Sequence, residues 1–297
     1  MTTQQTLSLP LPAQYRVADV LAFHARDAEG FAEQVDDAGV RKAVLLDGAP
    51  VLFDLRFGRD EVSCRIEADG ELDAAAGALA QEALRSILAL RIDPAPFAGF
   101  VRDDAVFGPL VQRQPGLRIV QSATVFEALT WAIIGQQINL PFAISLRRSF
   151  IEQAGRRHSS GLWCYPEAAD VARLAIETLT TRKFSRAKAE ALLRVARLVA
   201  DGELALRVDD DPERAAAALL AIKGIGPWTV NYTLLRGYGY ADCSLHGDVA
   251  VRSAIGRLTG AAVKPDIAQA QAWLEAYRPH RTMAAAYLWA SLSQAAG

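Results

Sequence analysis

The sequence predicts an α+β protein in which a small N-terminal domain with an antiparallel β meander precedes a larger all-helical domain. Hydrophobic and polar residues alternate through residues 51–57 and 62–66, which is the pattern of half-buried strands. From Thr124 onward this alternation fades, and residues that favour helix starts precede runs with helical spacing. We therefore expect domains at residues 1–113 and 114–297.

Turn-forming residues bound the two alternating runs. Asp47-Gly48, Gly58 and Asp69-Gly70 interrupt the hydrophobic pattern where an antiparallel meander needs tight turns. The elements expected in this part of the chain are a strand at residues 7–11, a helix at about 15–25, the two strands, a helix at about 72–90, and a connector with short helical pieces at 91–121.

Helix-start signals divide the rest of the chain. The string from Thr124 to Glu127 predicts a capping box, in which each side chain bonds the other residue's backbone N–H. Asp211 precedes Pro212, and proline is favoured at the first position of a helix. Ser185 is expected to cap a basic amphipathic helix.

Composition excludes several classes of protein. A chain of 297 residues that is 51% hydrophobic can bury a sizeable core, yet it has no apolar run long enough to span a membrane. Its N-terminus lacks the features of a signal peptide, which indicates a cytoplasmic protein. Cys64, Cys164 and Cys243 lie too far apart in the sequence for a metal knuckle, so no metal is expected. The net charge of −2 means that any nucleic acid must bind to a local face and to backbone amides.

The most informative segment is the string LLAIKGIGPWTVNYTLLRG at residues 219–237. A helix is expected to end before KGIG, and Pro227 to begin a second helix after a turn in which Gly224 and Gly226 permit positive φ. The first N–H groups of the second helix have no partner within it and can bind a phosphate. Ile225 is expected to fill the gap between the helices. A plain helical hairpin without a ligand is the alternative, and the length of the string argues against it.

This segment resembles the helix-hairpin-helix of the HhH-GPD DNA glycosylase superfamily, whose motif continues into a Gly/Pro-rich loop and an aspartate. The chain has this continuation, from Gly237 to Asp248. Within the superfamily it is similar to the bacterial 3-methyladenine DNA glycosylase II family, over nearly the whole chain. The further segments that carry the resemblance are Tyr15–Arg26, AIIGQQI at 132–138, and Arg278–Arg281.

The resemblance implies that Asp248 is the catalytic carboxylate. At the start of a predicted helix, its side chain would accept backbone N–H bonds and remain ionised. Cleavage of an N-glycosidic bond places positive charge on the sugar, and an anionic carboxylate stabilises that charge. The alternative is that Asp248 is only a helix cap. Lyase members carry a lysine two residues after the second hairpin glycine; Trp228 stands there in this chain, so base release without strand cleavage is expected.

The resemblance also implies a base pocket formed by Trp228, Tyr232, Phe23 and His280. Trp228 and Tyr232 are one helical turn apart and share a face. A cationic alkylated purine would be attracted to such rings by cation–π forces. His280 departs from the family, which has tryptophan at that position. For each aromatic residue the alternative is a place in the hydrophobic core.

A DNA-contacting surface is expected around the hairpin and the segment Gly135–Ile138. The resemblance implies that Gln137 is the wedge that fills the gap left by a flipped base, and buried structural glutamines are the alternative. Two basic clusters, Arg147-Arg148 and residues 182–188, either flank the DNA or, more commonly for charge runs, form solvated helix faces. The expected DNA-contacting residues are Gly224, Ile225, Gly226, Thr229, Gln136 and Gln137.

Together these patterns predict a monofunctional glycosylase that flips alkylated purines out of duplex DNA and releases them. A monomer is expected, with double-stranded DNA as its partner and no protein partner. No cofactor is expected, although the resemblance allows a monovalent cation at the hairpin carbonyls. An oxidised-purine glycosylase and a non-catalytic DNA-binding protein are alternatives. A sugar- or nucleotide-binding regulator built on the meander is a third, and residues 1–90 supply no phosphate loop for it.

Overall fold

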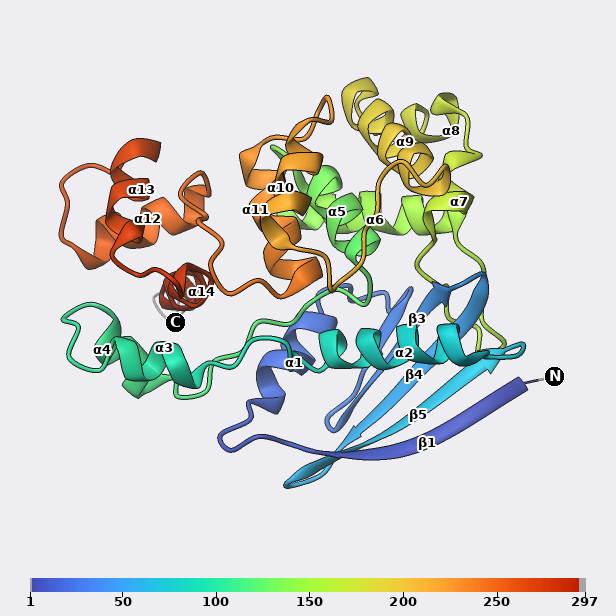
Figure 1. The fold of residues 1–297 in the computed structure, drawn as a ribbon, viewed down its shortest axis with the longest axis horizontal. Coiled ribbons are helices and arrows are strands. Elements are labelled where there is room, and N and C mark those ends of the chain that lie inside the picture. Colours follow the sequence, from blue (N-terminus) through green and yellow to red (C-terminus); the bar gives the residue numbers. More distant parts are fainter. Residues whose placement is uncertain (1, 294–297) are drawn as a thin grey trace.

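The computed structural model describes residues 2–293 and confirms an α+β fold (Figure 1). An antiparallel five-stranded sheet has the strand order β1-β5-β4-β3-β2, so that the first strand lies at one edge, beside the last. In Figure 1 the helices α5–α11 lie above the sheet, and α12–α14 lie to their left. The strands are β1 (Thr2–Pro10), β2 (Glu33–Val35), β3 (Gly39–Leu46), β4 (Ala49–Phe57) and β5 (Glu61–Asp69).

The helices follow the predicted order. The helix at 15–25, the helix at 72–90 and the short helical pieces of the connector are all present. A π-helical turn, Leu234–Tyr238, continues α11. The α-helices are α1 (Val17–His24), α2 (Ala74–Ile87), α3 (Ala95–Phe100), α4 (Phe107–Arg113), α5 (Val125–Gly135), α6 (Leu140–Ala154), α7 (Ala168–Ala172), α8 (Ile176–Thr180), α9 (Arg186–Ala200), α10 (Pro212–Leu220), α11 (Pro227–Thr233), α12 (Val249–Leu258), α13 (Ile267–Glu275) and α14 (Arg281–Ser293).

Strand β3 was not expected because it lacks alternation, and the structure shows why. Its second half forms hydrogen bonds with a segment from the helical region. The amide of Leu45 donates to the carbonyl of Tyr165 at 3.0 Å, and the amide of Tyr165 donates to the carbonyl of Ala43 at 3.2 Å. Leu162 and Cys164 cover the same face of the sheet. This half of the strand, residues 43–46, is buried on both faces and apolar, so no period of two remains in its sequence.

The helix caps are mostly as predicted. Ser185 and Asp211 each accept a backbone N–H from the first turn of their helix. Thr124 likewise accepts the amide of Glu127 at 3.0 Å, but the predicted capping box is wrong. The Glu127 carboxylate accepts the amide of Ala123 instead, and it also belongs to a group of buried charges.

Four charged side chains meet between the sheet and the helices, and we call them the charge cluster: Glu33 of β2, Lys42 of β3, Glu127 of α5 and Arg147 of α6. The ammonium of Lys42 lies 2.5 Å from Glu33 and 2.8 Å from Glu127. Arg147 lies 2.8 and 2.9 Å from the same carboxylates. Burial alone raises the pKa of Glu33, but Lys42 and Arg147 outweigh it and hold that pKa well below its usual value. Arg147 is therefore a core residue, and its expected place on a DNA-facing or solvated helix is corrected.

One continuous core joins the sheet to the helical region. It runs from Val20 of α1 and Phe53 of β4 to Leu129 of α5 and Leu288 of α14, all fully buried. Among the described residues, no helix is both long and apolar enough to cross a membrane.

Removing one member of the charge cluster should cost much of the stability of the fold. Lys42→Met leaves two buried carboxylates with a single cation, and we expect the free energy of unfolding to fall by about 3–5 kcal/mol. Arg41→Met, one residue earlier and bonded only at the surface, serves as the control and should change it little. Urea unfolding of both variants measures the difference. Equal losses for the two would contradict the proposed importance of the cluster.

Candidate active site

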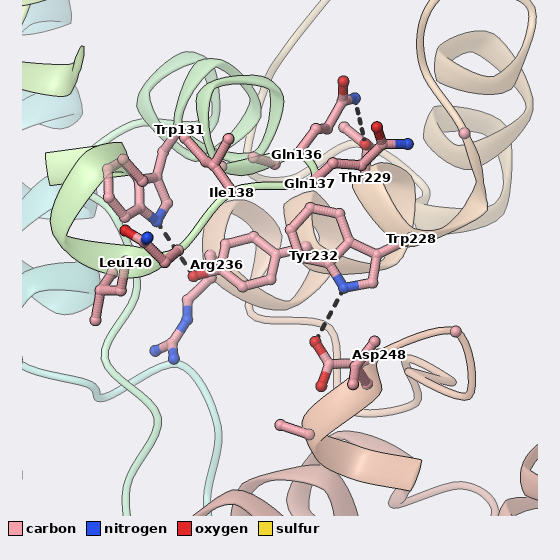
Figure 2. Close-up of a pocket in the computed structure, with 18 of the residues that line it drawn as sticks. Trp131, Gln136, Gln137, Ile138, Leu140, Trp228, Thr229, Tyr232, Arg236 and Asp248 are labelled. Carbon is pink, nitrogen blue, oxygen red and sulfur yellow. Dashed lines mark hydrogen bonds between the residues drawn. The ribbon is translucent and has the colours of Figure 1, made fainter. Parts of the chain in front are cut away.

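A cavity of about 1040 Å³ opens between the end of α5, the α10–α11 hairpin, the start of α12 and α14 (Figure 2). Aromatic rings, two arginines and one carboxylate are among the described residues that line it. The residues predicted from sequence that line this cavity are Asp248, Trp228, Tyr232, Gln136, Gln137, Gly224, Gly226 and Thr229.

The hairpin has the predicted form. Between the end of α10 and the start of α11 at Pro227, Gly224 has a φ of 99°, which favours glycine. Ile225 is buried between the helices, as predicted. A Cβ atom on Gly226 would have no protein atom within 4 Å, so this glycine leaves open space beside the first N–H groups of α11.

Gln136 fastens the end of α5 to the hairpin. Its side-chain amide donates to the hydroxyl of Thr229 at 2.9 Å (Figure 2). The same amide donates to the carbonyl of Gly224 at 3.2 Å. Thr229 is buried, so it supports the hairpin from within. Arg194 donates to the carbonyl of Lys223 at 2.8 Å, so two successive hairpin carbonyls accept side-chain bonds. A cation at the hairpin stays a prediction.

The carboxylate of Asp248 lies at the cavity wall and is held by three N–H donors. Asp248 is the N-cap of α12, as predicted, and its Oδ1 accepts the amide of Val251 at 2.9 Å. The indole of Trp289, from α14, donates to the same oxygen at 3.3 Å. The indole of Trp228 donates to Oδ2 at 3.1 Å. Donors on both oxygens fix the plane of the group.

Two stacked rings follow the carboxylate along the cavity. Trp228 and Tyr232 have centroids 5.2 Å apart and an interplanar angle of 27°. The indole of Trp131, from α5, donates to the hydroxyl of Tyr232 at 3.3 Å (Figure 2). An indole N–H bond at each end of this pair holds both rings in place, so a flat ligand in the cavity would meet a rigid aromatic surface.

Phe23 lies behind the cavity wall rather than in it. Its ring is 3.5 Å from the guanidinium carbon of Arg26 and 4.8 Å from that of Arg236. Both arginines line the cavity, whereas Phe23 does not. The expected contact of Phe23 with a base is therefore replaced by support of the two arginines, a stacking arrangement that guanidinium groups favour.

The arginines place positive charge beside Tyr232. Burial raises the pKa of Tyr232, but Arg236, Arg26 and the bond from Trp131 outweigh burial, and the net shift is downward. Burial also lowers the pKa of Arg26, with a smaller contribution from Arg236 in the same direction.

His280 does not line the cavity, contrary to expectation. Its ring packs at 5.5 Å from that of Phe100 and 6.3 Å from that of Phe97, on the connector between the sheet and α5. Four aromatic or charged residues that line the cavity were not predicted from the sequence: Arg26, Trp131, Arg236 and Trp289. Nothing in their local sequence distinguishes them, because folding brings them to the cavity from α5, α14, the turn after α1 and the π-helical turn.

Gln137 projects at the rim. It is exposed and has a φ of 55°, an uncommon conformation for a residue with a side chain. Leu140 on the same rim is 50% exposed. The role of Gln137 as a wedge stays a prediction. In the second basic cluster Lys188 is buried, and its ammonium donates to the carbonyl of Ile134 at 2.8 Å, so it supports α5 rather than facing DNA or solvent.

Residues 130–279 match the HhH-GPD superfamily base excision DNA repair protein model. The chain belongs to this superfamily. It is similar to a DNA-3-methyladenine glycosylase of Bacillus subtilis, with 32% identity over 202 residues, which make up 66% of this chain and 67% of that protein. It is 28% identical over 188 residues to DNA-3-methyladenine glycosylase 2 of Escherichia coli, covering 63% of this chain and 64% of that protein.

Solved structures establish the shared fold. A 3-methyladenine DNA-glycosylase from Archaeoglobus fulgidus aligns with a TM-score of 0.79 at 22% identity, over 95% of this chain and 97% of that chain. A Clostridium acetobutylicum 8-oxoguanine glycosylase/lyase in complex with double-stranded DNA aligns with a TM-score of 0.74 at 15% identity, over 100% and 99%. Proteins named for different bases share this architecture, so the fold by itself does not identify a base.

Replacing Arg236 with glutamine should raise the pKa of Tyr232. In the wild-type protein we expect Tyr232 to titrate below the ordinary value of 10.0, because the nearby positive charges favour the phenolate. Loss of one charge then moves the titration upward. NMR of ¹³C-labelled tyrosine follows it, with Tyr232→Phe identifying the signal. A Tyr232 signal that already titrates above 10.0 in the wild-type protein would contradict this account.

Proposed function

We propose that this protein is a monofunctional DNA glycosylase that hydrolyses the N-glycosidic bond of damaged purines, alkylated purines included, in duplex DNA. The observation that carries the proposal is the Asp248 carboxylate, held by three N–H donors beside a stacked aromatic pair and a helix-hairpin-helix. The names of the Bacillus subtilis and Escherichia coli relatives support the substrate class. A monomer that acts alone on DNA completes the proposal.

Asp248 would act on the sugar. As the bond to the base breaks, positive charge develops at C1′ and the ring oxygen, and the nearby anion lowers the free energy of this state. The carboxylate can also orient a water molecule and accept its proton. Because Trp228 and Trp289 fix its plane, this group needs little rearrangement when the charge appears.

The cavity would receive the base after it leaves the duplex. Trp228 and Tyr232 offer a flat surface on which a purine can stack, and this stacking offsets part of the free energy that flipping costs. Gln137, exposed at the rim, would occupy the gap in the duplex. The amides at the start of α11 would hold a phosphate of the same strand and set the position of the flipped nucleotide.

Strand cleavage is not expected of this site. A lyase needs an amine that attacks C1′ and forms a Schiff base. Trp228 stands at the position of the family's lysine, and its N–H bonds Asp248. Lys223 is exposed before the turn and does not line the cavity.

Asp248→Asn tests the catalytic role. Asparagine is also a good N-cap, so α12 and DNA binding should persist, while base release falls by roughly a thousandfold or more because the anion is lost. Asp266→Asn is the matched control, since Asp266 caps α13 through the same kind of bond and lies outside the cavity. Release of bases from methylated duplex DNA measures both, with strand nicking followed in parallel. If Asp248→Asn were as active as Asp266→Asn, Asp248 would be only a cap.

Gly226→Ala tests the hairpin as a phosphate site. The methyl group has free space in the protein and φ is negative at this residue, so the fold should be unaffected. It would block a phosphate from the α11 amides, and losing one such charge-assisted contact predicts roughly tenfold weaker DNA binding. Gly77→Ala in α2 is the control, again with no atom within 4 Å. Fluorescence anisotropy with labelled duplex DNA gives the affinities, and unchanged binding by Gly226→Ala would refute this contact.

A further inference from the structure

Two guanidinium groups line the cavity without an acidic partner. Arg26 donates its Nε to the carbonyl of Phe23 at 2.7 Å, and Arg236 donates Nη1 to the carbonyl of Val120 at 2.5 Å. Within residues 2–293 neither forms an ion pair, and the Nε of Arg236 is buried with no hydrogen-bond partner. Both arginine side chains are half-buried, and the ring of Phe23 compensates only part of their charge. The donors that remain without an acidic partner can bind a ligand with hydrogen-bond acceptors in the cavity.

Tyr232 adds a further donor to this wall. Its hydroxyl oxygen already accepts the indole N–H of Trp131, which leaves the phenolic proton free to be donated into the cavity. Tyr232, Arg26 and Arg236 thus present N–H and O–H donors and positive charge. The carboxylate of Asp248 accepts bonds from Trp228, Trp289 and the amide of Val251, and among the described residues it forms no ion pair with either arginine.

A donor-rich, positively charged wall suits a base edge that carries acceptors. A purine with a carbonyl at C6 presents O6 and N7 as neighbouring acceptors, the pair that a guanidinium recognises in guanine. Cationic 3-methyladenine presents an amino group at C6, and the N–H groups of this amino group would face the N–H and O–H donors of the wall. The positive charge of the base would also be repelled by both arginines.

We infer that Arg26 and Arg236 are specificity-determining residues that make the cavity select neutral 6-oxopurines, with hypoxanthine as the simplest example, over cationic 6-aminopurines. This inference rests on the proposed glycosylase function and names the substrate class of the same site.

The pair also suits the chemistry of a neutral leaving group. When the C1′–N9 bond breaks, its two electrons remain on the purine, which carries negative charge until it gains a proton. Guanidinium donors at O6 and N7 stabilise that charge. Water adds its oxygen to C1′ and gives its proton to Asp248, and the purine finally takes up one proton, so that one water is consumed for each base released. An alkylated cationic purine leaves as a neutral molecule and does not need this help.

The test compares two substrates: a duplex with a single hypoxanthine, and methylated duplex DNA that releases 3-methyladenine. The ratio of kcat/KM for hypoxanthine to that for 3-methyladenine is measured for wild type, Arg26→Gln and Arg236→Gln. We expect each variant to lower this ratio at least tenfold. Arg113→Gln is the matched control, since the exposed Arg113 also donates its Nε to a backbone carbonyl, and it should leave the ratio unchanged.

The outcomes separate this inference from the proposed function. Release of 3-methyladenine without hypoxanthine, or equal losses on both substrates, would overturn the specificity role and leave the glycosylase intact. Release of neither base by the wild-type protein would overturn both. If Arg236→Gln fails to fold because the bond to Val120 is lost, Arg26→Gln and Arg236→Lys still decide the question, since lysine keeps the charge but not the planar pair of donors.

Discussion

The position of the active-site helix depends on the charge cluster of Glu33, Lys42, Glu127 and Arg147. Two carboxylates and two cations balance one another in the core, where any one of them alone would be costly. Glu127 belongs to the first turn of α5, and α5 ends at the cavity with Gly135. The cluster therefore anchors the start of the helix whose other end places Gln136 against the hairpin.

The same cluster explains why the sheet region is part of the site rather than an appendage. His24, at the end of α1, bonds Glu33 at 2.9 Å, and two residues later Arg26 lines the cavity. Both ring nitrogens of His24 face oxygen atoms, one on Glu33 and one on Ile87. These contacts fix the end of α1 relative to β2 and α2. A segment far from the hairpin in sequence thus contributes a guanidinium to the cavity because the charge cluster fixes the helix before it.

Features with a local cause could be predicted from the sequence. The hairpin depends on two glycines separated by one residue and on a proline, and the capping role of Asp248 depends on the start of α12, so short strings specify both. Trp131 and Trp289 could not be recognised, since their bonds to Tyr232 and Asp248 join elements about 100 and 40 residues apart. The resemblance predicted which positions belong to the site, but it could not predict which side chains pack around them. Phe23 packs against Arg26 and Arg236, and these two arginines line the cavity in its place.

The order of groups along the cavity gives the site a direction. Asp248 bonds Trp228, Trp228 stacks on Tyr232, and Tyr232 lies in the field of Arg236 and Arg26. A nucleotide whose base stacks on this pair would have its sugar beside the anion and its base edge beside the cations. Hydrolysis moves electrons from the sugar toward the base, so both ends of the cavity would favour the same displacement. Because the rings are held by indole N–H bonds at each end, this polarity is built into the folded protein before any DNA arrives.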